Sequence, residues 1–312
     1  MFLYSMAIAG GCVGLYLGGN NLLKGATAIG QKLGWSAAVI GFVLVSLGTS
    51  APELFVSAGA ALQGYGDVAA GNVVGSNIVN IAIVLGLGAL ILPLTINRSI
   101  RLHQLPLMVL ITVLGFVFLL DGYLGRLESL VLLLAALGSV WWAMKIDGVP
   151  DLEKTLGEEL DSTSDQGNLM SAIWVLSGIL LLVAGAEGLI WGGVGLAATF
   201  GVPDALIALT VTSIGTGLPE ITATVLAVAK RETDLAVGNV VGSNLLNIGL
   251  VLGVSGLITP INSGGVGLFP LSIMLGATLL LVVLSWRPGY VARWMGGTLL
   301  TGFAAYTFFL VQ

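Results

Sequence analysis

Two similar seven-residue segments, residues 48–54 (GTSAPEL) and 215–221 (GTGLPEI), each place a glutamate directly after a proline inside a long apolar stretch. An ionisable side chain at membrane depth costs about 2.5–3.5 kcal/mol or more, so its presence predicts a function. Because proline has no backbone N–H, the carbonyl four residues before it lacks its helical hydrogen bond; here this is the carbonyl of Gly48 or Gly215. Such carbonyls are tolerated in a membrane where they line a cavity. Carbonyls, hydroxyls and carboxylates are hard oxygen ligands, which favour an alkali or alkaline-earth cation.

The composition places these segments in a membrane protein. Hydrophobic residues make up 56% of the 312-residue chain and charged residues only 9%, whereas soluble domains carry about 25% charged residues. Mean hydropathy is +1.03. We therefore expect an all-α polytopic protein embedded in the lipid bilayer, and at about 20 residues per span the length allows roughly ten transmembrane helices. The expected spans are 2–22, 36–63, 67–93, 104–121, 123–143, 169–199, 203–229, 234–258, 267–286 and 289–311.

The charge is concentrated in one polar linker, residues 144–168. Within it, residues 147–168 hold seven acids and one base, a net charge of −6, against −5 for the whole chain. The remainder is therefore nearly neutral, and nothing in this distribution favours nucleic-acid binding. Cys12 is the only cysteine, so an internal disulfide is excluded.

The two halves of the chain are repeats of one another. The sequence GNVVGSN occurs at residues 71–77 and again at 238–244, 167 positions later, and the same offset relates the two proline-glutamate segments. Five spans on each side of the linker mean that the second half enters the membrane the opposite way up, as in transporters built from inverted repeats with a site near the midplane. We expect a first five-helix repeat (1–143), an acidic cytoplasmic linker (144–168) and a second, inverted repeat (169–312), with broken helices at the midplane.

The basic residues predict an orientation. With the N-terminus outside, only Arg126 of the 11 basic residues falls on the outer side, and this bias predicts that both termini are outside. The ten on the cytoplasmic side are Lys24, Lys32, Arg98, Arg101, Lys145, Lys154, Lys230, Arg231, Arg287 and Arg293.

Helical spacing gathers polar residues into four stripes, two from each half, that can converge on one internal site. Calcium takes about 6–8 oxygen ligands; the two glutamates offer up to four, and amide oxygens or bent-backbone carbonyls could complete the shell. Sodium could use the same groups with hydroxyls in addition. The stripes are Ser46, Thr49, Glu53 and Ser57; Asn72, Ser76 and Asn80; Ser213, Thr216, Glu220 and Thr224; and Asn239, Ser243 and Asn247, with Ser50 as a further hydroxyl.

Two carboxylates at one site also predict a transport rule. Without a cation the site would carry a charge of about −2 in a low-dielectric region, which is costly to move through a closed state. One calcium ion or several sodium ions neutralise that charge, so the site favours obligatory exchange over uniport.

At these residues the chain resembles the sodium/calcium exchangers of the cation/calcium antiporter superfamily, in their short prokaryotic form. The segments GTSAPE with GNVVGSNIVN, and GTGLPE with GNVVGSNLLN, are similar to that family's two alpha-repeats. The resemblance implies calcium/sodium antiport by alternating access in a prokaryotic cytoplasmic membrane, with the first and sixth spans sliding past the other eight. We expect no cofactor and no obligatory protein partner. The resemblance implies cation-binding acids at Glu53 and Glu220, hydroxyl ligands at Thr49, Ser50, Ser76, Thr216 and Ser243, backbone-carbonyl ligands at Ser46 and Ser213, and further site positions at Asn80 and Asn247.

Two residues depart from the family pattern. Gly217 stands where the family usually has serine, so one hydroxyl is missing and one sodium position is affected. Asn247 stands where many prokaryotic and potassium-dependent members have aspartate, and the resulting asparagine pair resembles the potassium-independent animal exchangers.

Other functions fit the residues less well. A calcium/proton (or other divalent cation/proton) antiporter stays open, because both glutamates could carry protons. A channel usually assembles its pore from symmetric subunits, whereas here one chain holds both halves of a closed site. An enzyme is not indicated: the chain has a single histidine and neither an HExxH motif nor a GxSxG motif.

Overall fold

The computed structural model describes residues 1–146, 168–200, 215–286 and 289–311, and in this part of the chain the secondary structure is helical apart from four two-residue strands. The elements of the first half are α1 (Phe2–Lys32), α2 (Ala37–Val39), η1 (Ile40–Val45), α3 (Ser46–Thr49), α4 (Ala51–Leu62), α5 (Gly66–Val79), η2 (Asn80–Leu85), α6 (Gly86–Ile91), β1 (Leu94–Thr95), η3 (Ile100–Gln104), α7 (Leu105–Leu119), β2 (Tyr123–Leu124) and α8 (Arg126–Ile146), where η marks a π-helical segment. Those of the second half are α10 (Asn168–Thr199), α13 (Leu218–Ala229), α14 (Thr233–Leu246), η5 (Asn247–Leu252), α15 (Gly253–Ile258), β3 (Ile261–Asn262), α16 (Leu268–Trp286), β4 (Tyr290–Val291) and α17 (Arg293–Val311).

These helices confirm a polytopic all-α membrane protein with bent helices. In the described part of the chain, seven helices are long and apolar enough to cross a membrane, and the pair α2–α3 and α4, bent by 44°, makes an eighth. Helix α13 is a shorter apolar helix, and residues 203–214 of the expected seventh span lie outside the described residues. Helix α17 covers residues 293–311 of the last expected span, 289–311, whose start includes strand β4.

The first helix is longer than expected. The prediction ended the first span at residue 22, but α1 continues to Lys32. Hydropathy falls at Asn20, Asn21 and Lys24, yet no proline interrupts the backbone there, so the helix continues beyond the end of its apolar stretch. At 1.5 Å per residue its 31 residues extend about 46 Å, more than the hydrocarbon thickness of about 30 Å, so the helix extends beyond the hydrocarbon region or crosses it at a tilt.

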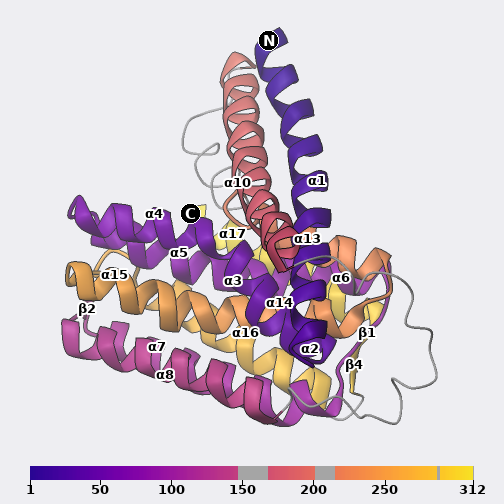
Figure 1. Cartoon of the computed structure of the whole chain (residues 1–312). Helices are drawn as coiled ribbons and strands as arrows, with labels where there is room; N and C mark the ends of the chain where they lie inside the picture. The colour runs from indigo at the N-terminus through magenta and orange to yellow at the C-terminus, as the bar shows by residue number, and fades with distance from the viewer. Residues whose placement is uncertain (147–167, 201–214, 287–288, 312) are drawn as a thin grey trace.

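The repeat recurs element by element. An offset of 167 residues carries α4 onto α13, α5 onto α14, η2 onto η5 and α6 onto α15 with identical boundaries. The same offset carries β1 onto β3 and β2 onto β4, and the strands pair across the halves: β1 with β4, and β2 with β3, both antiparallel. Figure 1 shows the two pairs at opposite ends of the helices, where each joins a loop of the first half to a loop of the second.

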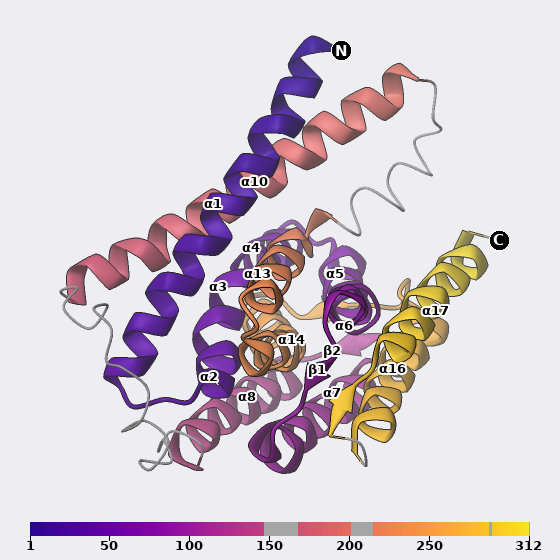
Figure 2. The same ribbon diagram turned by 90° about the vertical axis from the view of Figure 1, so that its right-hand side faces the viewer.

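The chains of helices α5–η2–α6 and α14–η5–α15 are the most buried of the described spans, and they contact one another at the centre of the molecule. Helices α1 and α10 lie outside this core and cross it steeply as a closely packed pair (Figures 1 and 2). Small residues allow this approach, as is common between membrane helices: a Cβ atom on Gly185 of α10 would lie 2.7 Å from the backbone nitrogen of Leu15 of α1.

Candidate functional site

Each half contains a helix break just before its proline-glutamate pair. The last residue before the new helix is Ser50 in the first half and Gly217 in the second, with nearly identical backbone angles: φ −81° and ψ 3°, and φ −81° and ψ 0°. The prolines then occupy the first turn of α4 and of α13, where a missing N–H costs nothing. The break therefore places Glu53 and Glu220 in the first turn of a helix, where the helix dipole favours a negative charge.

Both glutamates are completely buried, with 0% of each side chain exposed. Among the described residues, neither carboxylate oxygen of Glu53 has a hydrogen-bond partner. In Glu220, Oε1 accepts a bond of 3.2 Å from the Ser50 hydroxyl, and Oε2 has no partner. The two carboxyl groups lie close enough to interact electrostatically. A buried charge is costly unless it is paired, so this arrangement calls for a bound cation or protons.

Asn80 and Asn247 add two amides of the same kind. Each begins a π-helical segment, η2 or η5, a geometry that often marks functional sites. Both side chains are buried, and among the described residues neither the oxygen nor the nitrogen of either amide has a hydrogen-bond partner. An unsatisfied buried amide costs about 1–3 kcal/mol, which binding of a cation to the amide oxygen would offset.

The hydroxyl groups divide into free and engaged ones. The Ser76 hydroxyl lies near the Glu53 carboxylate without forming a hydrogen bond to it, and has no other partner in the described structure. The Thr49 hydroxyl lies 3.3 Å from Oδ1 of Asn239 and 3.4 Å from the hydroxyl of Ser243. Thr49 and Ser243 therefore tie α3 to α14, across the two halves.

The remaining predicted positions differ in how much the structure says of them. The Ser46 carbonyl accepts hydrogen bonds from the Ser50 amide, at 2.9 Å, and from the Thr49 hydroxyl, at 3.3 Å. A cation bound to this carbonyl would therefore share the oxygen with these two donors. Thr216 lies just before the break in the second half and is partly buried. Ser213 lies outside the described residues.

Two further asparagines were not predicted for the site. Asn77 on α5 donates from Nδ2 to the backbone oxygen of Asn244 on α14, at 3.1 Å, while Asn244 donates to its own helix at Val240, at 2.8 Å. Asn77 and Asn244 are repeat equivalents, and both are buried with a side-chain oxygen that has no partner among the described residues. The signal that could have found them is their place at the end of both GNVVGSN segments, three residues before Asn80 and Asn247.

Close backbone approach explains a glycine in the second GNVVGSN segment. A Cβ atom on Gly242 would lie 2.2 Å from the backbone oxygen of Phe42 and 2.6 Å from the hydroxyl of Ser46. Glycine thus lets α14 pack directly on η1 and α3, which brings Ser243 and Asn239 within reach of Thr49.

The donors suit a hard cation. The described residues include no group of three or more His, Cys, Asp or Glu side chains that could hold a metal ion. Two carboxylates, two amides and several hydroxyls form an all-oxygen set, which suits calcium or an alkali cation better than a transition metal.

The surroundings of the site are not symmetric. On α1, a Cβ atom at Gly19 would lie 2.7 Å from the Leu226 side chain and 3.0 Å from the Thr222 side chain of α13. The repeat equivalents of Gly19 and Thr222 are Ala186 on α10 and Phe55 on α4, and Phe55 is 76% exposed. The helix pair therefore covers α13 and leaves the equivalent face of α4 uncovered by α10.

Comparisons with known proteins find relatives over nearly the whole length of the chain. The family model described as "Sodium/calcium exchanger protein" matches residues 4–145 and 170–312. The protein CaxA of Alkalimonas amylolytica is 36% identical over 99% of both chains. Inner membrane protein YrbG of Escherichia coli is 33% identical, over 91% of this chain and 89% of its own. A solved structure of the sodium-calcium exchanger NCX_Mj superposes with a TM-score of 0.84 at 26% identity, over 100% of this chain and 98% of that one.

Proposed function

The chain belongs to the sodium/calcium exchanger family, and from this premise we propose that it exchanges calcium for sodium across the membrane by alternating access. Members of this family are cation/calcium transporters, not enzymes. The observation that carries the proposal is the pair of fully buried glutamates, one from each inverted half, whose oxygens are mostly without partners among the described residues. Calcium and sodium are the substrates, and no cofactor takes part.

In this proposal Glu53 and Glu220 hold the calcium ion from opposite sides, and the amide oxygens of Asn80 and Asn247 complete much of its shell. The lack of hydrogen-bond partners for the Glu53 carboxylate and the two amide oxygens supports the assignment, because these groups can bind the cation without losing a hydrogen bond. Sodium ions use the same carboxylates together with hydroxyl and carbonyl oxygens. The proposed additional sodium ligands are Thr49, Ser50, Ser76, Thr216 and Ser243 through their hydroxyls, and Ser46 and Ser213 through their carbonyls.

The charge of the site explains why transport is exchange. With both carboxylates ionised and no cation, the buried site carries a charge of −2, and such a species resists passing through an occluded state. One calcium ion or several sodium ions compensate it. The loaded protein therefore changes conformation readily and the empty one does not, so influx of one ion requires efflux of the other.

The uneven packing of α1 and α10 supports alternating access. In an inverted repeat, the packing made by one half in one state can be made by the other half in the opposite state. The contact of Gly19 with α13 then belongs to one state, and a contact of Ala186 with Phe55 on α4 belongs to the other. With both termini outside, as the basic residues indicate, α13 lies in the cytoplasmic half of the membrane and α4 in the outer half. We place the chain in a prokaryotic cytoplasmic membrane, consistent with the inner-membrane name of YrbG.

Coupling is tested by reconstituting the protein into vesicles and imposing sodium and proton gradients separately. We expect an outward sodium gradient to drive calcium uptake, and a proton gradient alone to drive none. Uptake that follows the proton gradient and ignores sodium would establish the calcium/proton alternative, in which the same glutamates carry protons. Calcium flux that needs no counter-ion would contradict exchange altogether and indicate a channel.

Gly217→Ser is expected to lower the sodium concentration that half-inhibits calcium uptake. Ser50 and Gly217 share backbone angles, and Ser50 donates to Glu220 at 3.2 Å, so a serine at 217 fits the backbone and by symmetry faces Glu53. One added neutral oxygen contributes on the order of 1 kcal/mol, which is about fivefold in affinity at most. Calcium affinity should change less, because its main ligands are carboxylates.

Sodium titrations of calcium uptake measure this effect, with Ser50→Gly as the matched reverse change, which should raise the half-inhibiting sodium concentration. If Gly217→Ser folds normally and leaves sodium inhibition unchanged, position 217 does not face a sodium site. If calcium and sodium binding weaken together, the added side chain crowds the bend beside Pro219.

A further inference from the structure

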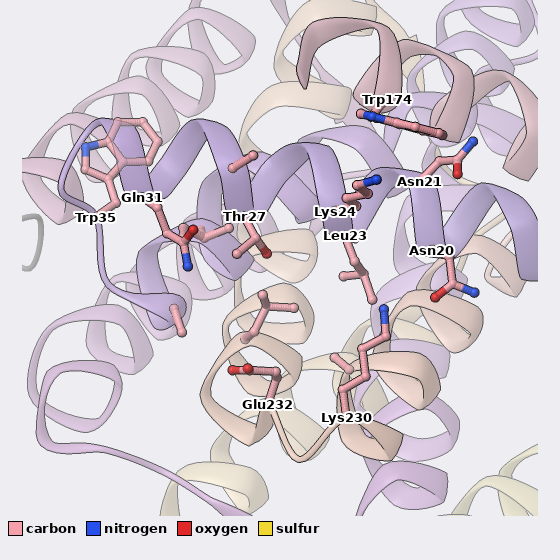
Figure 3. A pocket seen from close by; sticks show the side chains of 15 residues that line it. Asn20, Asn21, Leu23, Lys24, Thr27, Gln31, Trp35, Trp174, Lys230 and Glu232 are labelled. Carbon is pink, nitrogen blue, oxygen red and sulfur yellow. The ribbon is translucent and has the colours of Figure 1, made fainter. Parts of the chain in front are cut away.

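A second polar site lies away from the glutamates, in a cavity of about 640 Å³ between α1 and the neighbouring ends of α13 and α14. None of the proposed cation ligands lines it. Figure 3 shows Lys230 reaching from the core toward α1, with Glu232 beside it, and Lys24 on α1 lying against Trp174. The cavity therefore lies between the α1–α10 pair and α13, the core helix that carries Glu220.

The cationic groups of this cavity are available to a ligand. Lys24 and Lys230 are both exposed, and neither forms an ion pair or a side-chain hydrogen bond with the described residues. Lys24 Nζ lies 4.4 Å above the centre of the Trp174 ring, which holds the ammonium group in place. The indole N–H of Trp174 is buried and also lacks a partner among the described residues. Among the described residues, Glu232 is the only acid lining the cavity, against two lysines, so the described lining carries a net charge of +1.

Apolar and aromatic side chains adjoin these charges. Trp35, Ile40 and Leu235 line the same cavity, so a ligand with a negative head and an apolar body matches both parts of the wall. Under the proposed orientation the cavity opens at the cytoplasmic end of α13, where the leaflet surface carries anionic lipids. Basic pockets between membrane helices on that side are suited to phospholipid head groups.

We propose that this cavity binds the phosphate of an anionic phospholipid, with Lys24 and Lys230 as its principal contacts. The apolar wall then contacts the part of the acyl chains that lies next to the glycerol. A lipid bound there touches α1, α10 and α13 together. It therefore bridges the helix pair to the core and stabilises the arrangement in which α1 covers α13.

The test measures binding to the detergent-purified full chain by calorimetry, with three probes: short-chain phosphatidylglycerol, short-chain phosphatidylcholine and inorganic phosphate. We expect phosphatidylglycerol to bind more tightly than the other two. Lys24→Gln and Lys230→Gln should each weaken its binding about fivefold, equivalent to about 1 kcal/mol for each lysine near a lipid phosphate. Glu232→Gln should strengthen it by a similar factor, because it removes the opposing charge.

Lys145→Gln is the matched control, since Lys145 is an exposed lysine at the end of α8, assigned to the same side of the membrane and outside the cavity. Equal binding by wild type, the two lysine variants and the control would overturn the proposal. Inorganic phosphate binding as tightly as phosphatidylglycerol would overturn the lipid assignment. Because the readout is binding, its failure is separate from any failure of the exchange experiment.

Discussion

Glu53→Gln and Glu220→Gln are each expected to abolish calcium exchange in reconstituted vesicles while the protein remains folded. Each variant leaves a divalent cation facing one carboxylate instead of two, in a site from which water is excluded and where electrostatic interactions are strong. The fold should survive, because Glu53 makes no side-chain hydrogen bond with the described residues and Glu220 makes one, from Ser50. Calcium uptake driven by a sodium gradient is the measurement.

A second measurement separates the site from a general structural defect. Without ions, each glutamine variant should unfold at a higher temperature than the wild type, because two buried carboxylates no longer repel one another. Adding calcium should raise the unfolding temperature of the wild type and change that of the variants much less. Glu187→Gln on α10, where the carboxylate is exposed, is the matched control and should retain exchange. Near wild-type transport by either Glu53→Gln or Glu220→Gln would show that the proposed site is wrong.

Cross-linking α1 to α13 is expected to stop exchange completely. A Cβ atom at position 19 lies 3.0 Å from Cγ2 of Thr222, so cysteines at Gly19 and Thr222 can form a disulfide with little movement. The tightest neighbour of the new side chain is the flexible end of Leu226, which can rotate away. The background is Cys12→Ser, because Cys12 is an exposed thiol.

Exchange should cease on oxidation and return on reduction, because α1 can no longer leave α13. In the repeat-equivalent pair, Ala186→Cys with Phe55→Cys, Phe55 is exposed in this structure, and the pair should cross-link only when the helix pair moves to its other position. Each single-cysteine variant is the control for oxidation alone. Undiminished exchange after complete cross-linking of positions 19 and 222 would rule out alternation through movement of α1 over α13.

Much of the architecture could be predicted from the residues themselves. Long apolar stretches in a bilayer have few structural solutions other than helices, because every backbone group must be satisfied within the segment. The constant offset between Glu53 and Glu220, and between the two GNVVGSN segments, then requires two similar halves. The proline before each glutamate required a break, and the structure has one at Ser50 and one at Gly217.

Local detail at Asn80 and Asn247 could not be predicted in this way. The periodicity of an α-helix and that of a short π-helical segment differ too little over six residues to be read from side-chain spacing. The end of α1 was also misplaced, because hydropathy reports where a helix leaves the apolar region and not where its backbone hydrogen bonds end.

The sequence by itself determined the membrane class, the inverted repeat and the acids at the centre, because burial of charge, helical period and the odd number of spans are properties of the chain alone. Only the tertiary structure decided which groups meet across the halves: Ser50 with Glu220, Thr49 with Ser243, and Gly19 with Thr222. The repeat assigns identical roles to equivalent residues, yet in this structure the α1–α10 pair packs on α13 and leaves Phe55, on the equivalent face of α4, exposed. That choice depends on packing between segments far apart in the chain, and it is the asymmetry on which exchange would depend.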